Sequence, residues 1–266
     1  MFDYHVHSNF SADCNTPMEK SMEQAVALGL KEICFTEHID YEYPDPTIDF
    51  DLDLTGYAAK IKQLQEKYQD IIQIKKGVEI GVQPYLLDRY QQLMDKEPFD
   101  FVICSMHTAD KKDLHSGDFF KEKSTSEAYQ MYYQELLYCV KNYRSYSVLG
   151  HLDLVKRHQA EPINEHFTDL ISAIFKEIIP AGKGIELNTS GVRYGLNNGM
   201  PSVDILKLYK ELGGEIITLG SDSHSDQTIA FLFKESLELL EQVGFRYIAT
   251  FNNQSPTFHT IKDINK

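Results

Sequence analysis

The chain has 266 residues, of which 42% are hydrophobic, and a formal net charge of -14 at pH 7. We expect residues 1–266 to form a single domain, because this length allows a substantial core and α/β barrels commonly reach this size as one unit. The acidic balance argues against general affinity for nucleic acid or an anionic membrane, since both need clustered Lys and Arg. A small phosphorylated substrate is not excluded, because bound metal cations would make the field inside a site positive.

Cysteine usage and the start of the chain indicate the compartment. The four cysteines are widely spaced and form no C-x-x-C pair, and two of them lie in apolar runs where a thiol behaves as a small hydrophobe. Met1 leads directly into an apolar strand, which supports neither a signal peptide nor a membrane span. We therefore expect a reduced, cytoplasmic protein; the cysteines are Cys14, Cys34, Cys104 and Cys139.

Short apolar runs alternate with helical periodicities along the whole chain. Strands are expected at 2–8, 32–36, 71–78, 101–105, 146–149, 184–187 and 216–219, with one more possible at 246–251. Helices are expected at 17–29, through Ile61, Leu64 and Tyr68, and at 85–94, 127–141, 167–179, 203–212 and 229–243. This rhythm is typical of parallel βαβ units, and seven or eight such units predict a closed barrel.

Two local patterns add detail. Thr16, Pro17 and Glu19 fit a helix start with a capping box in which Thr16 is the N-cap. The acidic segment 40–53 carries two prolines and predicts a long loop over the mouth of the barrel, where loops are often functional lids.

The stretch FDYHVHS, residues 2–8, delivers His5 and His7 in H-x-H spacing. Positions two apart on a strand share one face, so both imidazoles can reach a single metal ion. Later strands also end at histidines or carboxylates, which the fold of a barrel brings to one rim. These strand-end residues are Glu37, His38, Glu79, His107, His151, Asp222 and His224.

Six of the ten histidines thus end apolar strands on one predicted rim, and this clustering predicts a metal centre. A single histidine at a strand end is more often a hydrogen-bonded structural group. For the other four histidines we expect structural roles, because they lie in loops, near a helix start or in the C-terminal segment: His115, His158, His166 and His259.

The motifs DYHVHS, FTEH, GVE, SMH, GHLD and GSDSH, in this order and at these spacings, resemble those of the polymerase and histidinol phosphatase (PHP) superfamily. The match runs from residue 3 to residue 224. NFSADCNTP and TEHIDYEYPDP resemble the histidinol-phosphatase branch in particular. The resemblance implies a distorted (β/α)7 TIM-like barrel whose metal site lies at the C-terminal ends of the strands.

The resemblance further implies three divalent metal ions. The first would be held by His5, His7, Glu79 and Asp222, the second by Glu79, His107 and His151, and the third by His38 and His224. Some relatives supply another histidine where this chain has Asp13, and a carboxylate there favours iron or manganese over zinc. His38 and Asp13 would also contact the substrate.

The constellation predicts phosphate-ester hydrolysis. A metal-bridging water can ionise near neutral pH while the ions neutralise the phosphoryl oxygens. Arg157 and Arg193 follow strand ends and could clamp the phosphate, as the resemblance also suggests. Asp153 and Asp3 are near ligands; either could orient an imidazole, and Asp153 could instead protonate the leaving alkoxide.

The branch resemblance implies hydrolysis of L-histidinol phosphate to L-histidinol and phosphate, a step of histidine biosynthesis. In the acidic loop, Asp40, Glu42 or Asp45 could meet the amine of such a substrate. Two alternatives stay open: another phosphoesterase of the superfamily, acting on nucleotides, nucleic-acid ends or phosphotyrosine, and a catalytically silent metal-binding barrel. The oligomeric state is left open.

Overall fold

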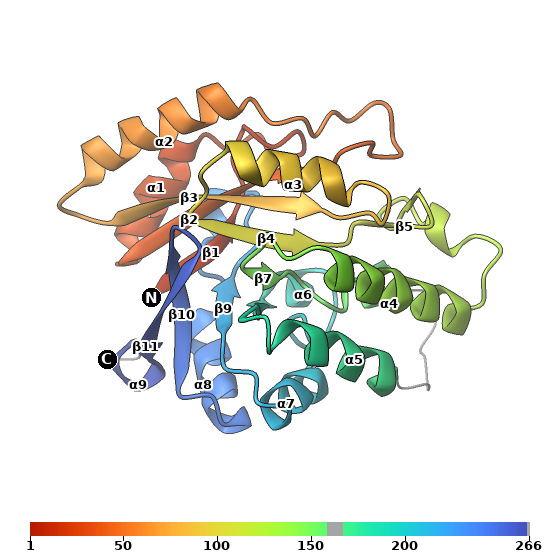
Figure 1. Ribbon diagram of the computed structural model, residues 1–266. Coiled ribbons are helices and arrows are strands. Elements are labelled where there is room, and N and C mark those ends of the chain that lie inside the picture. The colour runs from red at the N-terminus through yellow and green to blue at the C-terminus, as the bar shows by residue number, and fades with distance from the viewer. Residues whose placement is uncertain (159–166, 265–266) are drawn as a thin grey trace.

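The computed structural model describes residues 1–158 and 167–264. In these residues seven parallel strands form one sheet in the order β1-β2-β3-β4-β7-β8-β9, with helices packed on its outside (Figure 1). Except at the start of β3, the strands are buried, because the barrel interior covers one of their faces and helices cover the other. Their bounds are β1 (Phe2–Val6), β2 (Glu32–Ile39), β3 (Gln73–Gly81), β4 (Phe101–Ser105), β7 (Val148–Leu149), β8 (Gly184–Asn188) and β9 (Ile217–Gly220).

The two edge strands of this sheet, β1 and β9, meet and nearly close it into a barrel. Val6 and Ser223 form a parallel bridge. The backbone N–H of His7 donates to the carbonyl of Ser223 at 2.9 Å, and the N–H of Ser223 donates to the carbonyl of His5 at 3.3 Å. The expected distorted (β/α)7 barrel is therefore confirmed; that residues 1–266 form a single domain stays a prediction.

The longer helices lie where the periodicity predicts them, with ends shifted by a few residues, whereas the two four-residue helices were not predicted. Their bounds are α1 (Met18–Ala27), α2 (Leu54–Tyr68), α3 (Leu87–Lys96), α4 (Thr125–Asn142), α5 (Thr168–Ile178), α6 (Ser190–Arg193), α7 (Val203–Glu211), α8 (Phe233–Val243) and α9 (Ile261–Ile264). Among the described residues, no helix combines the length and the apolar character that crossing a membrane requires. All four cysteines are buried and unpaired.

The start of α1 differs from the prediction. Pro17 precedes the helix and no side chain caps it, so the predicted capping box is wrong. The hydroxyl of Thr16 instead donates to the carbonyl of His224 at 3.0 Å, and Glu19 pairs with Lys60 at 2.6 Å. A tertiary contact with the segment after β9 has therefore taken the cap residue away from the helix.

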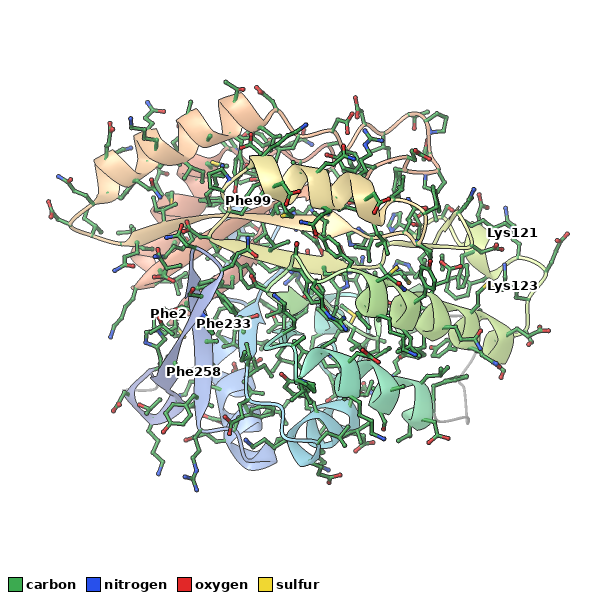
Figure 2. All side chains as sticks on the ribbon, viewed as in Figure 1. Phe2, Phe99, Lys121, Lys123, Phe233 and Phe258 are labelled. Carbon is green, nitrogen blue, oxygen red and sulfur yellow. The ribbon has the colours of Figure 1, made fainter. Side chains whose placement is uncertain are left out.

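The possible eighth strand does form, but not in the barrel. β10 (Tyr247–Asn252) pairs antiparallel with β11 (Ser255–Thr260) in a separate hairpin. This hairpin lies at the N-terminal end of the barrel strands, opposite their arrowheads (Figure 1). Phe2 and Phe258 lie together in this part of the molecule, far from Lys121 and Lys123 (Figure 2).

The hairpin is joined to the barrel by buried contacts. The Tyr4 hydroxyl bonds to the Glu32 carboxylate and accepts the Phe251 backbone N–H at 2.7 Å. The rings of Phe101 and Phe251 lie 5.0 Å apart, and the hairpin turn bonds to Asp100. The hairpin of β10 and β11 thus covers the end of the barrel that faces away from the predicted metal ligands. A second short hairpin, β5 (Thr108–Ala109) and β6 (Lys112–Asp113), follows β4 in the chain.

Candidate metal centre

The H-x-H pair of β1 points into the C-terminal end of the barrel. Both imidazoles are wholly buried, and the Nε2 atoms of His5 and His7 lie 3.0 Å apart. The alternation of side chains on a strand places them on one face, as predicted. Their nitrogens therefore converge on one point inside the barrel.

Glu79, on β3, lies between two pairs of histidines. Its Oε2 is 3.0 Å from His5 Nε2 and 3.4 Å from His7 Nε2. Its Oε1 is 2.9 Å from His151 Nε2 and 3.3 Å from His107 Nε2. Burial alone would raise the pKa of Glu79, but the neighbouring imidazoles hold that pKa well below its usual range. An ionised carboxylate whose two oxygens serve two sets of nitrogens has the placement of a bridging ligand.

A third group lies beside the first. Asp13 Oδ2 is 3.2 Å from His224 Nε2 and 3.6 Å from His38 Nε2. The ring of His7 stacks on the rings of His38 and His224, with centroids 4.2 Å apart in each case. Burial and these two imidazoles lower the pKa of His7 to about 3, so its ring is neutral and has a free lone pair, as metal binding requires.

Asp222 connects the first and third groups. Its Oδ1 lies 3.5 Å from His7 Nε2 and 3.6 Å from His224 Nδ1. Its Oδ2 accepts from the hydroxyl of Ser190 at 3.0 Å. The backbone of Asp222 is in the left-handed region, with φ of 52°, a conformation that costs a non-glycine residue energy and is often found at functional sites.

The predicted ligands therefore form overlapping groups that fit metal ions. Imidazole nitrogens and carboxylate oxygens are common ligands of zinc, iron and manganese. Three sets have ligand atoms close enough to share an ion: His7, His38 and His224; His5, His7 and Asp222; and His38, Glu79 and His107. The donor types and their convergence match a multinuclear metal centre.

Behind these groups lies Glu186, on β8, which sequence reasoning missed. Its Oε2 is 2.8 Å from His5 Nδ1, and its Oε1 accepts the backbone N–H of His151 at 2.8 Å. One buried carboxylate thus contacts residues from two of the groups. The only signal in the sequence was an acidic residue inside the apolar run GIELN.

Asp40 contacts a histidine of the centre. Its side chain is buried at the edge of the cavity, and Oδ1 lies 2.6 Å from His107 Nδ1, while contact with a substrate amine stays a prediction. A side chain at Gly81 would overlap this carboxylate, so the glycine gives it room. Glu42 is exposed and lies near Arg89, and Asp45 is half-buried and bonds with Thr47.

Asp3 and Glu37 support the centre without touching its predicted ligand nitrogens. Asp3 accepts the backbone N–H groups of His5, Ser221 and Ala230, so it orients the backbone where β1 meets β9. Glu37 accepts from the hydroxyl of Ser11, which lies 3.2 Å from His7 Nδ1. The expectation that Asp3 could bond an imidazole is not supported by these contacts.

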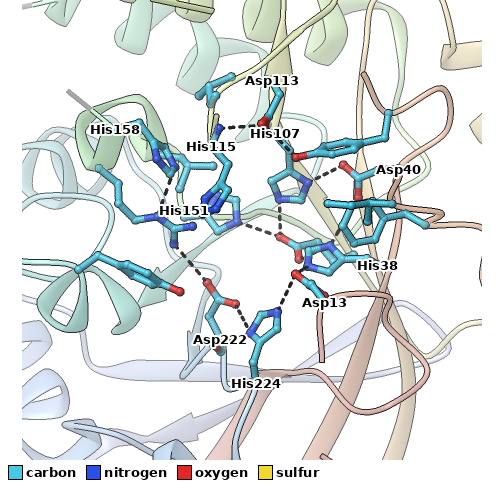
Figure 3. Close-up of a pocket in the computed structure, with 18 residues that line it drawn as sticks. Asp13, His38, Asp40, His107, Asp113, His115, His151, His158, Asp222 and His224 are labelled. Carbon is cyan, nitrogen blue, oxygen red and sulfur yellow. Dashed lines mark hydrogen bonds and ion pairs between the residues drawn. The ribbon is translucent and has the colours of Figure 1, made fainter. Parts of the chain in front are cut away.

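A cavity of about 320 Å³ opens above the centre (Figure 3). Its floor includes Glu79, Asp222, His38, His107, His151 and His224. The mouth loop 40–53 forms part of its wall, as predicted for a lid over the barrel. Its other walls come from the segments after β6, β7 and β8; the wall residues are Tyr43, Ile48, Phe50, Asp113, Leu114, His115, Leu154, Arg157, His158 and Tyr194.

The predicted phosphate and proton-transfer residues are separated in the structure. Arg157 lines the cavity, with its guanidinium over the Tyr194 ring and Nη1 3.9 Å from Asp222 Oδ2. Arg193 lies behind the floor, where Nη2 donates to the carbonyl of Asp222 at 2.9 Å. Asp153 is buried away from this cavity and pairs with Lys156 at 2.8 Å, which does not support a role as general acid.

The histidines for which we expected structural roles divide into two kinds. His115 and His158 line the cavity, with ring centroids 5.6 Å apart. His259, on β11, bonds to the Thr250 hydroxyl at 2.8 Å, as a structural group would. His166 lies outside the described residues.

Comparison with known proteins agrees with this geometry. The family model of the PHP domain matches residues 3–190. A histidinol-phosphatase from Lactococcus lactis subsp. lactis is 35% identical over 94% of each chain, and a probable histidinol-phosphatase from Clostridium acetobutylicum is 30% identical over 92% of this chain and 95% of its own. A crystal structure of histidinol phosphate phosphatase from L. lactis, complexed with Zn, L-histidinol and phosphate, superposes with a TM-score of 0.85, 34% identity and coverage of 96% and 98%.

Proposed function

Because this chain belongs to the PHP domain family, we propose that it is a histidinol-phosphatase, which hydrolyses L-histidinol phosphate to L-histidinol and phosphate. The L. lactis relative carries that name and spans the same length. The L. lactis crystal structure contains L-histidinol and phosphate, which are the two products of this reaction, together with zinc.

The placement of Glu79 carries the proposal. Its two oxygens face two pairs of imidazoles, 2.9 to 3.4 Å away, beneath a cavity that also contains an arginine. A carboxylate in this position is suited to bridge two metal ions, and paired ions are a frequent solution for phosphate-ester hydrolysis.

We propose three divalent ions, of which zinc, iron and manganese all suit the donors. When bound, such ions lower the pKa of water and neutralise the charge on phosphoryl oxygens. The residues that would hold them are His5, His7, Glu79 and Asp222 for the first, Glu79, His107 and His151 for the second, and Asp13, His38 and His224 for the third.

The other residues of the centre position these ligands. Glu186 accepts from Nδ1 of His5, and Asp40 accepts from Nδ1 of His107. Each bond fixes the tautomer that leaves Nε2 of that histidine free to bind a metal. Arg157 would bind the phosphoryl group from the cavity wall. Arg193 holds the Asp222 segment, and its Nη1 is buried without a hydrogen-bond partner among the described residues. Contact of this guanidinium with the phosphoryl group stays a prediction.

The test is phosphate release from L-histidinol phosphate, p-nitrophenyl phosphate and a mononucleotide, using protein whose metals have been counted by elemental analysis. We expect a preference for L-histidinol phosphate of about 100-fold or more in kcat/KM, which corresponds to about 2.7 kcal/mol of differential transition-state binding. Similar slow rates on all three compounds, with metal bound, would keep the phosphatase and reject this substrate.

A further inference from the structure

Asp113 is the acidic wall residue that the metal centre does not use. It ends β6 and is 6% exposed. Its Oδ1 accepts from the Tyr43 hydroxyl and from the His115 backbone N–H, both at 2.8 Å, and its Oδ2 accepts from the Ser116 N–H at 2.6 Å. Three hydrogen bonds from two loops therefore fix this carboxylate at the cavity wall.

The charge of Asp113 is not neutralised by a cation nearby. Burial would raise its pKa, but the N–H groups of Ser116 and His115 outweigh burial and hold the pKa below its usual value, so the group is ionised. In residues 1–158 and 167–264, no side-chain nitrogen of Lys, Arg or His lies within 4.0 Å, the distance of an ion pair, of the Asp113 carboxylate. The other carboxylates of the cavity are each beside an imidazole of the centre: Asp13, Asp40, Glu79 and Asp222.

The position of Asp113 gives the cavity two unlike ends. Figure 3 shows Asp113 on the opposite side of the drawn group from Asp222 and His224, with His151 and His107 between them. Arg157 lies at the Asp222 end, 3.9 Å from that carboxylate. Leu114 and Leu154 line the wall nearby. A ligand with an anionic group at one end and a nitrogen donor at the other would match this arrangement.

The proposed reaction has such a substrate. Resting on that function, we propose that Asp113 is the binding site for the leaving group and accepts a hydrogen bond from a nitrogen of the histidinol portion, either its ammonium or its imidazole N–H. A hydrogen bond to an ionised carboxylate is about twice as strong as one between neutral groups. The Tyr43 hydroxyl positions this carboxylate, and the ligand nitrogen takes an oxygen lone pair that the three existing bonds leave free.

The experiment compares Asp113→Asn with the unmodified protein on four substrates: L-histidinol phosphate, its analogue without the amine, its analogue without the imidazole, and p-nitrophenyl phosphate. We expect kcat/KM for L-histidinol phosphate to fall about 10- to 100-fold, and kcat/KM for p-nitrophenyl phosphate to change less than about threefold. The analogue that lacks the partner nitrogen should show no loss, which identifies the amine or the imidazole as that partner.

The controls separate binding from folding. Asp118→Asn removes the same charge from an exposed position five residues later and should leave the preference unchanged. Tyr43→Phe keeps the turn around Asp113 and should lower the preference by a smaller factor. Metal content and melting temperature are measured for each variant.

Two failures are distinguishable. If the unmodified protein had no preference for L-histidinol phosphate, the proposed function would fail and the leaving-group site with it. Suppose instead that the unmodified protein prefers L-histidinol phosphate. Then only the leaving-group site would be wrong if Asp113→Asn kept that preference, or if its kcat/KM fell equally on all four substrates.

Discussion

The two ends of the barrel use the same strands for opposite purposes. At the N-terminal end, Tyr4 bonds to both Glu32 and Phe251, and aromatic rings fill the space beneath the hairpin. At the C-terminal end, imidazoles and carboxylates crowd together, and several buried atoms there, including Nδ1 of His151 and Oδ2 of Asp40, have no hydrogen-bond partner among the described residues. Contacts within the chain satisfy the polar groups of the first end, whereas those of the second are suited to bind ligands.

One residue apart on β1, Tyr4 and His5 belong to these two different environments. The comparison teaches that stability and function can be altered separately in this protein. A change at the hairpin end should lower the free energy of unfolding and leave the chemistry of folded molecules intact, while a change at the centre should lower metal binding and activity.

The largest expected effect is that of Glu79→Gln. The amide cannot bridge two ions as an anion, so metal and activity should be lost together, with kcat/KM falling by about 10³-fold or more. Elemental analysis and phosphate release measure the two losses. Glu66→Gln, at an exposed position on α2, is the control, and full metal content in inactive Glu79→Gln would contradict the bridging role.

Phe251→Ala tests the other end. Removing a buried ring that packs on Phe101 should lower the free energy of unfolding by about 3–5 kcal/mol. Denaturant unfolding of the metal-loaded protein measures this, and kcat/KM below the transition should stay near its unmodified value. The matched control is Phe258→Ala, on the same hairpin but 46% exposed, which should cost far less. Equal losses of unfolding free energy in Phe251→Ala and Phe258→Ala would contradict the stabilising role of the buried ring.

Arg157→Ala addresses the cavity wall. Losing the guanidinium should raise KM and lower kcat, with a combined fall of about 10²-fold in kcat/KM, because a charged donor to the phosphoryl group is gone. Metal content should not change. Arg157→Lys keeps the charge but not the two-pronged geometry and should recover part of the loss; no difference between the two variants would argue against bidentate binding.

Glu186→Gln should have the smallest effect of the four. It removes the charge that orients His5 but keeps the size of the side chain, so metal affinity should fall about 10- to 100-fold. Competition with a chelator measures this independently of activity. Glu215→Gln, with its side chain in solvent, should retain metal like the unmodified protein.

Sequence reasoning succeeded where a local rule decides the outcome. Alternation along β1 placed His5 and His7 on one face, and the rule that parallel strands end on one rim brought Glu79, His107 and His151 together. These rules need no knowledge of distances between strands, which explains why they worked on sequence alone.

Sequence reasoning failed where a tertiary contact, and not the local sequence, decided the structure of a segment. Thr16 has the sequence of an N-cap but bonds to His224, and 246–251 has the composition of a barrel strand but joins a hairpin. Glu186 was missed because its partner His5 is a neighbour only after the sheet curls back on itself. The contact of Asp40 with His107 was missed because nothing in the sequence shows that Gly81 leaves a space for that carboxylate.

The seam between β1 and β9 has a consequence for folding. It has few backbone bonds of its own, and it joins residues such as His5 and Ser221 that are 216 positions apart in the chain. A metal ion shared by His5, His7 and Asp222 would act as a cross-link across that seam, and cross-links that span long loops restrict the unfolded chain most. A single bound ion would therefore hold the first strand of the barrel to the last and keep the barrel closed.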